Sequence, residues 1–179
     1  MTRFLIGTKF VSCFLALSLV ATPSSYVLPY PSFMPGHKLF KVKNIFDRLY
    51  GIWCFGSLAQ FKYNLRMTDK KLVEAKTLFE YGQLSLGITA MRKYKFYLNQ
   101  TFLALERARG ERKNISQKSK VFGEAMKKHK EVLDGLLSKV PETVYWQEER
   151  KEGKVLKIRE ELNSALNEAE ILSQRLVRL

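Results

Sequence analysis

The chain has 179 residues, 46% of them hydrophobic, and its 31 basic and 17 acidic residues give a formal net charge of +14. This hydrophobic fraction is enough for a buried core, which excludes disorder of the whole chain, and the length leaves room for one domain. A balance this basic indicates an anionic neighbour such as a membrane surface, a wall polymer or nucleic acid, with a solvated, soluble surface as the alternative. After Pro35 prolines are few and runs of β-branched residues are absent, which favours an all-α protein.

The first 21 residues have the pattern of a secretory signal peptide. A basic start with Arg3 and Lys9 precedes an apolar run that ends at Ala21. As a helix this run is about 18 Å long, against about 30 Å for the hydrocarbon core of a bilayer. Residues 1–21 are therefore predicted to be a signal peptide, with an uncleaved N-terminal anchor as the alternative. The protein is expected to be secreted or extracytoplasmic, or to be tethered to the membrane.

Cysteine usage excludes a disulfide framework. The cysteines are Cys13 and Cys54. If Cys13 leaves with the signal segment, Cys54 has no partner in the mature chain, so the fold must depend on packing alone. The apolar neighbours of Cys54 predict a buried, inert thiol rather than a reactive one.

Residues 22–36 form a proline-rich stretch. Its prolines alternate with Tyr26, Tyr30 and Phe33, and prolines at this density hold a backbone extended and block a helix. The stretch is predicted to be an extended strap that lies across the domain with its aromatic side chains anchored in grooves. A docking site for a proline-binding partner is the alternative.

Residues 37–139 are predicted to be an antiparallel helical bundle built on a central helical hairpin. The hairpin runs from Leu58 to Arg109 with its turn at residues 81–83, where Gly82 suits the left-handed conformation that ends a helix. Apolar residues recur every three or four positions in both arms, which places them in one stripe per arm. The stripes are Leu58, Phe61, Leu65, Thr68, Leu72, Ala75 and Phe79 in the first arm, and Leu84, Ile88, Met91, Leu98, Phe102 and Leu105 in the second, where Lys95 interrupts the pattern with Tyr94 beside it.

Amphipathic helices precede and follow this hairpin. Ser57 is predicted to cap its first arm, and Asn114 or Ser116 to cap a fourth helix. The first helix runs from about His37 to Trp53. Its apolar stripe is Leu39, Val42, Phe46, Leu49 and Trp53, and the inner face of the fourth helix is Phe122, Ala125, His129, Val132 and Leu136.

Residues 140–179 are predicted to form a long amphipathic C-terminal helix with Pro141 in its first turn. Its first half, up to Gly153, is less periodic, and Gly153 is a point where the helix bends or breaks. A strict apolar stripe follows, which indicates a coiled-coil partner, either another helix of this chain or a second copy in a homodimer. The stripe is Val155, Ile158, Leu162, Ala165, Ala169, Leu172 and Leu176.

Three stretches carry a resemblance to a known family. The segment from Tyr30 to Lys43 resembles the opening of an uncharacterised domain family of secreted or membrane-anchored bacterial proteins. The stretch from Asp69 to Gly82 looks like its second helix, and Lys128–Leu133 resembles part of its fourth. Gly36, Lys38 and the pair Gly56–Ser57 depart from the family pattern. The resemblance covers roughly residues 26–139 and implies a proline-rich lead, a bundle of four to five helices and an extracytoplasmic location, but no activity.

The groups that catalysis or metal binding needs are scarce. Two histidines, His37 and His129, and Cys54 have no metal-ligand or nucleophile–base spacing. His129 is interpreted as a hydrogen-bonded packing residue, and His37, in the turn before the first helix, as a capping residue or a group that holds the proline-rich strap in place. Gly82 and Gly87 have the spacing of a phosphate-binding loop but lack the lysine that must follow. No catalytic, cofactor-binding or metal-binding residue is predicted, and the carboxylates at Glu148, Glu149, Glu152, Glu160 and Glu161 are interpreted as surface pairs.

Basic clusters are the remaining candidates for function. They are Arg92–Lys95, Arg107–Lys113 and Lys118–Lys130. The sequence therefore predicts a non-enzymatic interaction or structural module of the cell envelope, whose basic surface meets an unknown protein or an anionic polymer or lipid. The alternative is a basic helical protein that binds nucleic acid through phosphate contacts and stacking on tyrosines that alternate with basic residues. Tyr94 and Tyr97, however, have helical spacing and are expected to pack within the protein. The two glycosylation sequons, at Asn99 and Asn114, are interpreted as chance.

Overall fold

A computed structural model describes residues 25–31, 35, 38–147 and 153–179. The predicted signal segment, Phe33, His37, Glu148, Glu149 and Glu152 lie outside this range. The elements in chain order are α1 (Leu39–Trp53), α2 (Ser57–Glu80), α3 (Leu84–Gly110), α4 (Ser116–Leu137), β1 (Thr143–Trp146), β2 (Lys154–Lys157) and α5 (Ile158–Val177).

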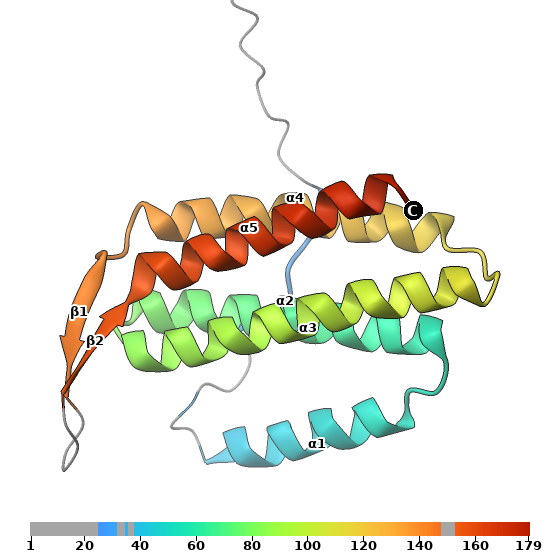
Figure 1. Cartoon of the computed structure of the whole chain (residues 1–179). Coiled ribbons are helices and arrows are strands. Elements are labelled where there is room, and N and C mark those ends of the chain that lie inside the picture. The colour runs from blue at the N-terminus through green and yellow to red at the C-terminus, as the bar shows by residue number, and fades with distance from the viewer. Residues whose placement is uncertain (1–24, 32–34, 36–37, 148–152) are drawn as a thin grey trace, which may run out of the picture.

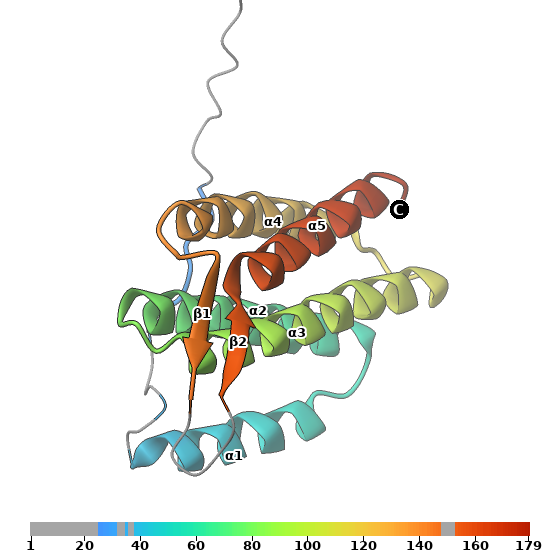
Figure 2. The same cartoon turned by 60° about the vertical axis from the view of Figure 1, so that its left-hand side comes forward.

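The helices lie in three layers, with the hairpin of α2 and α3 in the middle (Figure 1). The pair α4 and α5 covers one side of this hairpin and α1 lies on the other, an arrangement that Figure 2 shows from a second direction. The short strands form an antiparallel ladder at one end of the bundle. The prediction of an all-α bundle built on a central hairpin is confirmed.

The predicted hairpin forms because both of its apolar stripes are buried. All predicted stripe residues of α2 except the half-buried Leu58 are buried, as are those of α3 from Ile88 onward. The turn is closed by hydrogen bonds from the Gly82 and Gln83 amides to the carbonyls of Phe79 and Leu78, and Gly82 has a φ of 72°, as expected for a residue that ends a helix. Where Lys95 interrupts the apolar stripe of α3, the neighbouring Tyr94 fills the core and is fully buried.

The fourth and fifth helices close the core from one side. Phe122 of α4 packs edge-on against Phe61 of α2, with ring centroids 6.3 Å apart, and lies 6.2 Å from Phe102 of α3. The stripe of α5 is buried from Ile158 to Leu172 against helices of the same chain. The first of the two predicted partners for this stripe, a helix of this chain, is therefore present, and the homodimer stays a prediction.

The prediction of one long helix over residues 140–179 is wrong in its first half. Thr143–Trp146 pairs with Lys154–Lys157 in antiparallel register, with Val144 opposite Leu156 and Tyr145 opposite Val155. The β-branched and aromatic residues of β1 favour a strand. At Gly153 a Cβ atom would overlap the ring of Tyr145, so the residue expected to bend a helix instead lets two strands approach.

The residues predicted to cap α2 and α4 make other contacts than the predicted ones. Helix α2 begins at Ser57, whose hydroxyl makes no cap but donates to Glu111 Oε2 at 2.6 Å and so ties the start of α2 to the end of α3. Ahead of α4, the Asn114 side chain accepts a hydrogen bond from the Ser116 amide at 3.1 Å. Pro141 begins no helix. The α5 amides of Ile158 and Arg159 instead donate to the Glu142 carbonyl, which satisfies two donors of its first turn.

Gly87 is a close-packing position in the hairpin. A Cβ atom there would lie 2.7 Å from Cε1 of the buried Phe79 ring. We expect Gly87→Ala to lower the free energy of unfolding by about 1–3 kcal/mol, because the ring must leave its rotamer. Urea denaturation measures this, with Gly135→Ala in α4 as the control. Nothing lies within 4 Å of a Cβ at Gly135, so this change should gain up to about 1 kcal/mol from helix propensity. Equal effects of the two substitutions would contradict the prediction.

Candidate functional site

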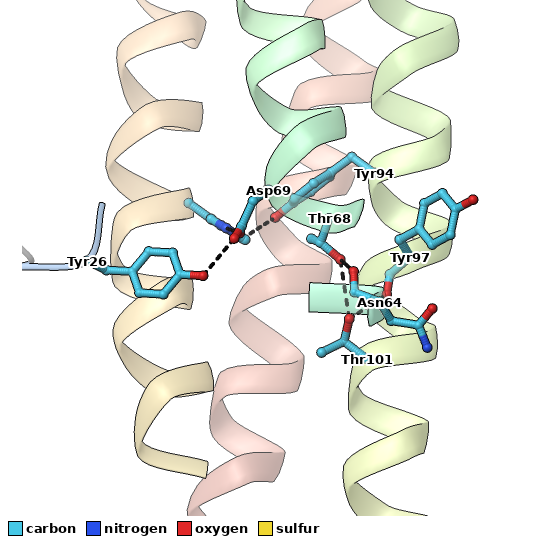
Figure 3. Close-up of polar contacts among 8 residues, drawn as sticks. Tyr26, Asn64, Thr68, Asp69, Tyr94, Tyr97 and Thr101 are labelled. Atoms are coloured by element: carbon cyan, nitrogen blue, oxygen red, sulfur yellow. Dashed lines mark hydrogen bonds and ion pairs between the residues drawn. The ribbon is translucent and has the colours of Figure 1, made fainter. Parts of the chain in front are cut away.

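The strongest polar cluster in the described residues is a buried chain of hydrogen bonds across four segments (Figure 3). Tyr26 of the strap donates to Asp69 Oδ2 at 2.6 Å, and His129 Nε2 of α4 lies 2.8 Å from Asp69 Oδ1. Tyr94 of α3 places its hydroxyl 3.4 Å from His129 Nδ1. His129 and Tyr94 are fully buried, and Asp69 is 6% exposed.

The Asp69 carboxylate determines which groups donate and which accept in this hydrogen-bond network. Both oxygens of an ionised Asp69 can only accept, so His129 Nε2 carries the proton and Tyr26 donates. Burial, followed by the charge of Asp69, raises the pKa of Tyr26 and of Tyr94. Both phenols therefore stay protonated and available as donors. A histidine paired with a carboxylate is also the geometry of an oriented general base, but here the imidazole is 0% exposed and packed between the rings of Tyr26 and Tyr94.

The site confirms part of the sequence interpretation and corrects part. His129 is a hydrogen-bonded packing residue, as expected, and Tyr26 is anchored as the strap prediction requires. The prediction is wrong for Tyr30, which is 92% exposed. The partner acid, Asp69, was missed. A histidine on an apolar stripe indicates that a buried hydrogen-bond partner exists. The position of Asp69 in the sequence, however, does not show that this residue lies next to His129.

A second buried polar pair lies beneath α1. Lys71 Nζ and Glu74 Oε2 of α2 are 2.5 Å apart, and both side chains are at most 7% exposed. Phe40 of α1 places its ring 5.9 Å from the Lys71 ammonium. Burial, followed by the positive charge of Lys71, lowers the pKa of Lys43, which also lies on α1. Helix α1 therefore covers a charged part of the hairpin.

The inner face of α1 is polar, which is the reverse of the prediction. Lys70 of α2 pairs with Asp47 at 2.7 Å, and the Tyr63 hydroxyl donates to the Asp47 carbonyl at 3.0 Å. Gly51 lies directly against the Tyr63 ring. The stripe predicted to pack inward is instead exposed: Leu39, Val42, Phe46, Leu49 and Trp53. We call the outward set the α1 apolar face; it consists of Leu39, Val42, Ile45, Phe46, Leu49, Tyr50, Ile52 and Trp53, and it is continued by Phe55.

The thiol of Cys54, at the end of α1, is free and half-buried. Its predicted burial is thus confirmed only in part. Among the described residues, no group of three or more His, Cys, Asp or Glu side chains is placed to hold a metal ion. Within the same residues, none of the helices combines the length and the apolar character needed to span a bilayer.

The three basic clusters differ in how far carboxylates neutralise them. In the first, Lys95 Nζ lies 2.7 Å from Glu161 Oε1 and Arg92 Nε lies 3.7 Å from Glu161 Oε2. The pairing is as predicted, but Glu161 is not a solvated surface residue, because its side chain is only 17% exposed. Glu160 does form the predicted surface pair, with Lys157. This group borders a groove lined by α3, β2 and α5.

In the second cluster Lys113 pairs with Glu111, and Arg107 donates to the Gln60 side chain. The third cluster, on α4, is different. Within the described part of the chain, Lys120, Lys127 and Lys130 are exposed and have no carboxylate partner. The expected packing of Tyr94 and Tyr97 is confirmed, since Tyr94 is buried and the Tyr97 ring lies 6.3 Å from that of Tyr63.

Glu168 makes the stability of the α3–α5 contact depend on pH. Its carboxylate accepts a hydrogen bond from Asn99 of α3, and burial raises its pKa above the ordinary value of 4.5, with Lys95 opposing the shift. Because the folded-state pKa is the higher one, this group stabilises the fold fully below pH 4.5 and the contribution is lost as pH rises through the raised pKa. We expect Glu168→Gln to be more stabilising, relative to wild type, at pH 7 than at pH 4.

Urea denaturation of wild type and Glu168→Gln, measured in parallel from pH 4 to pH 7, gives the difference in their free energies of unfolding. The contributions of the other titrating groups cancel in this difference. Glu170→Gln on the same helix is the control, because Glu170 is exposed. A difference that does not change with pH for Glu168→Gln would contradict the prediction.

Comparison of the chain with protein-family models, with curated proteins and with solved structures finds no match.

Proposed function

We propose that this protein is a non-enzymatic interaction module of the cell envelope, secreted or held at the membrane by its N-terminal segment, which binds an anionic polymer or lipid through its basic surface. The observation that carries the proposal is the row of lysines on α4. Lys120, Lys127 and Lys130 recur at spacings of seven and three residues, so they share one side of the helix. All three are exposed and without a carboxylate partner in the described residues.

The row of α4 lysines lies beside a groove. Lys127 and Lys130 line it together with Ser173, Gln174 and Glu170 of α5, so that two ammonium groups and one carboxylate share the groove. Ammonium groups next to hydroxyl and amide donors suit phosphate or carboxylate groups repeated along a polymer. Because the lysines are solvated, binding is expected to be electrostatic and to weaken with salt.

The buried polar chain supports a structural role over an enzymatic one. Tyr26, Asp69, His129 and Tyr94 use their polar atoms on one another, and the imidazole between them is completely covered. Substrate would have to separate α2, α3 and α4 to reach it. A chain of this kind fixes the strap and three helices in one arrangement.

The location is tested by cell fractionation with N-terminal sequencing of the mature chain. The proposal expects the protein in the extracytoplasmic or membrane fraction, with its N-terminus either at about residue 22 after cleavage or unprocessed in the membrane. Full-length protein found only in the cytosol would overturn it.

Binding is tested with a soluble polymer that carries one phosphate per repeat. We expect the triple variant K120Q/K127Q/K130Q to bind about tenfold or more weakly, with the slope of log affinity against log salt reduced by up to about 3. The matched control is K76Q/K113Q/K157Q, which removes the same charge from lysines already paired with Glu80, Glu111 and Glu160. Equal losses in the two variants would contradict a role for α4. Selective binding to duplex DNA over this polymer would favour the nucleic-acid alternative.

A further inference from the structure

The α1 apolar face has no counterpart elsewhere on the described surface. Within residues 39–55, nine large hydrophobic side chains are exposed, among them Phe46 at 67%, Trp53 at 79% and Phe55 at 82%. Scattered exposed hydrophobic residues are ordinary, but a contiguous set of this kind marks an interaction surface. Most of it is not covered by the bundle, because α1 contacts α2 mainly through the opposite, polar side of the helix. Only Tyr50, at the margin of the face, reaches α2, where its ring lies 6.0 Å from that of Tyr63.

The width of this face distinguishes between its possible occupants. At about 100° per residue, the exposed apolar residues of α1 span an arc of about 160° on the helix, centred away from the side that holds Asp47 and Gly51. The seam that a coiled-coil partner covers is narrower than this. A broad apolar arc on a helix at the edge of a molecule fits a planar surface better than it fits one helix of a second copy.

The charges around the face favour an anionic surface. Lys38 and Lys41 are exposed at the start of α1. Between Lys38 and Gly56 the only acidic residue is Asp47, and its carboxylate is held by Lys70 on the bundle side. The outward side therefore combines hydrophobic and aromatic residues with basic residues and has no carboxylate, which is the composition of helices that lie in the interface of an anionic bilayer.

We propose that α1, continued by Phe55, is an interfacial helix whose apolar face inserts between the lipids of an anionic bilayer while Lys38 and Lys41 contact the headgroups. The inference rests on the proposed function and names lipid as the partner. This proposal accounts for the polar contacts between α1 and the bundle. Asp47 pairs with Lys70 and accepts a hydrogen bond from Tyr63 on the inner side of the helix, and the apolar side remains free to contact the membrane.

The test uses the full chain, so that the N-terminal segment contributes equally to every sample. Trp53 is the reporter, in a Trp146→Phe background that leaves it as the single tryptophan. With vesicles of equimolar phosphatidylglycerol and phosphatidylcholine we expect the Trp53 emission to shift to the blue and to be quenched by brominated acyl chains. Vesicles of phosphatidylcholine alone should give a weaker response. Unchanged Trp53 emission with the anionic vesicles would overturn the inference, even if the protein sediments with them.

Paired variants separate α1 from general hydrophobicity. Phe46→Gln with Leu49→Gln is expected to weaken vesicle partitioning at least about tenfold. The control is Phe96→Gln with Leu103→Gln on α3, a matched pair that is 58% and 44% exposed, against 67% and 50% for Phe46 and Leu49. Equal partitioning of the two variants would contradict the inference. A wild-type dimer in analytical sedimentation that becomes monomeric only in the Phe46→Gln/Leu49→Gln variant would also contradict it, because a second copy of the chain would then cover the α1 apolar face.

The two proposals fail in different ways. If the protein is extracytoplasmic and binds the phosphate polymer but Trp53 stays in water, only the lipid inference is lost. If the protein is confined to the cytosol, the proposed function is lost whatever the vesicles show.

Discussion

Replacing Asp69 by alanine is expected to lower the free energy of unfolding by about 3–5 kcal/mol. The substitution removes the acceptor of two hydrogen bonds at once, because Tyr26 and His129 each use one of its carboxylate oxygens. The His129 N–H would then lie in a dry interior without a partner, and an unsatisfied buried donor costs more than the bond itself contributes. Urea denaturation followed by circular dichroism measures the loss.

Tyr26→Phe is the matched control for Asp69→Ala. It removes one donor to Asp69 and leaves the bond to His129 in place, so it should cost about 1 kcal/mol. The two variants should share a second phenotype, faster proteolysis between residues 25 and 31, because both release the strap. An Asp69→Ala protein that is no less stable than Tyr26→Phe would show that the buried chain does not stabilise the fold.

Phe102→Ala is expected to destabilise the protein by about 3–5 kcal/mol. Its ring is 1% exposed, lies at the junction of α3 with α4 through Phe122, and carries the Arg175 guanidinium of α5 at 4.6 Å from its centroid. The cavity would therefore open where three helices meet, and the cation–π contact would be lost with it. The shift of the urea midpoint at constant slope measures the effect.

Phe96→Ala on the same helix provides the control for this prediction. Phe96 is 58% exposed, so its loss should change stability by no more than about 0.5 kcal/mol. Comparable losses for both phenylalanines would mean that the core does not run through Phe102.

The central hairpin could be predicted because helical periodicity reports burial directly. Once Phe61, Leu72 and Met91 fall in stripes on two helices joined by a three-residue turn, antiparallel packing of the stripes is the simplest way to remove them from water. The β-hairpin was missed because its strands are only four residues long. The strong helical pattern that starts at Ile158 was extended backwards over them.

The orientation of α1 could not be predicted from periodicity. A stripe of apolar residues shows that a helix has an apolar face, but not what covers that face. Long-range polar contacts decided the question, since Asp47 meets Lys70 and Gly51 admits the Tyr63 ring. The candidate site has the same limit: His129 was identified from its stripe, while Asp69 became visible only when α2 and α4 were placed side by side.

The residues that meet at Asp69 come from distant parts of the sequence, which has an evolutionary consequence. Tyr26, Asp69 and His129 are separated by more than 40 positions from one another, and loss of Asp69 removes the hydrogen-bond partner of both other side chains. Substitutions at positions 26 and 129 are therefore expected to be coupled through position 69. Sequences that descend from a common ancestor with this fold should exchange positions 26, 69 and 129 together, and a correlated loss of all three would mark the branch on which the strap was released.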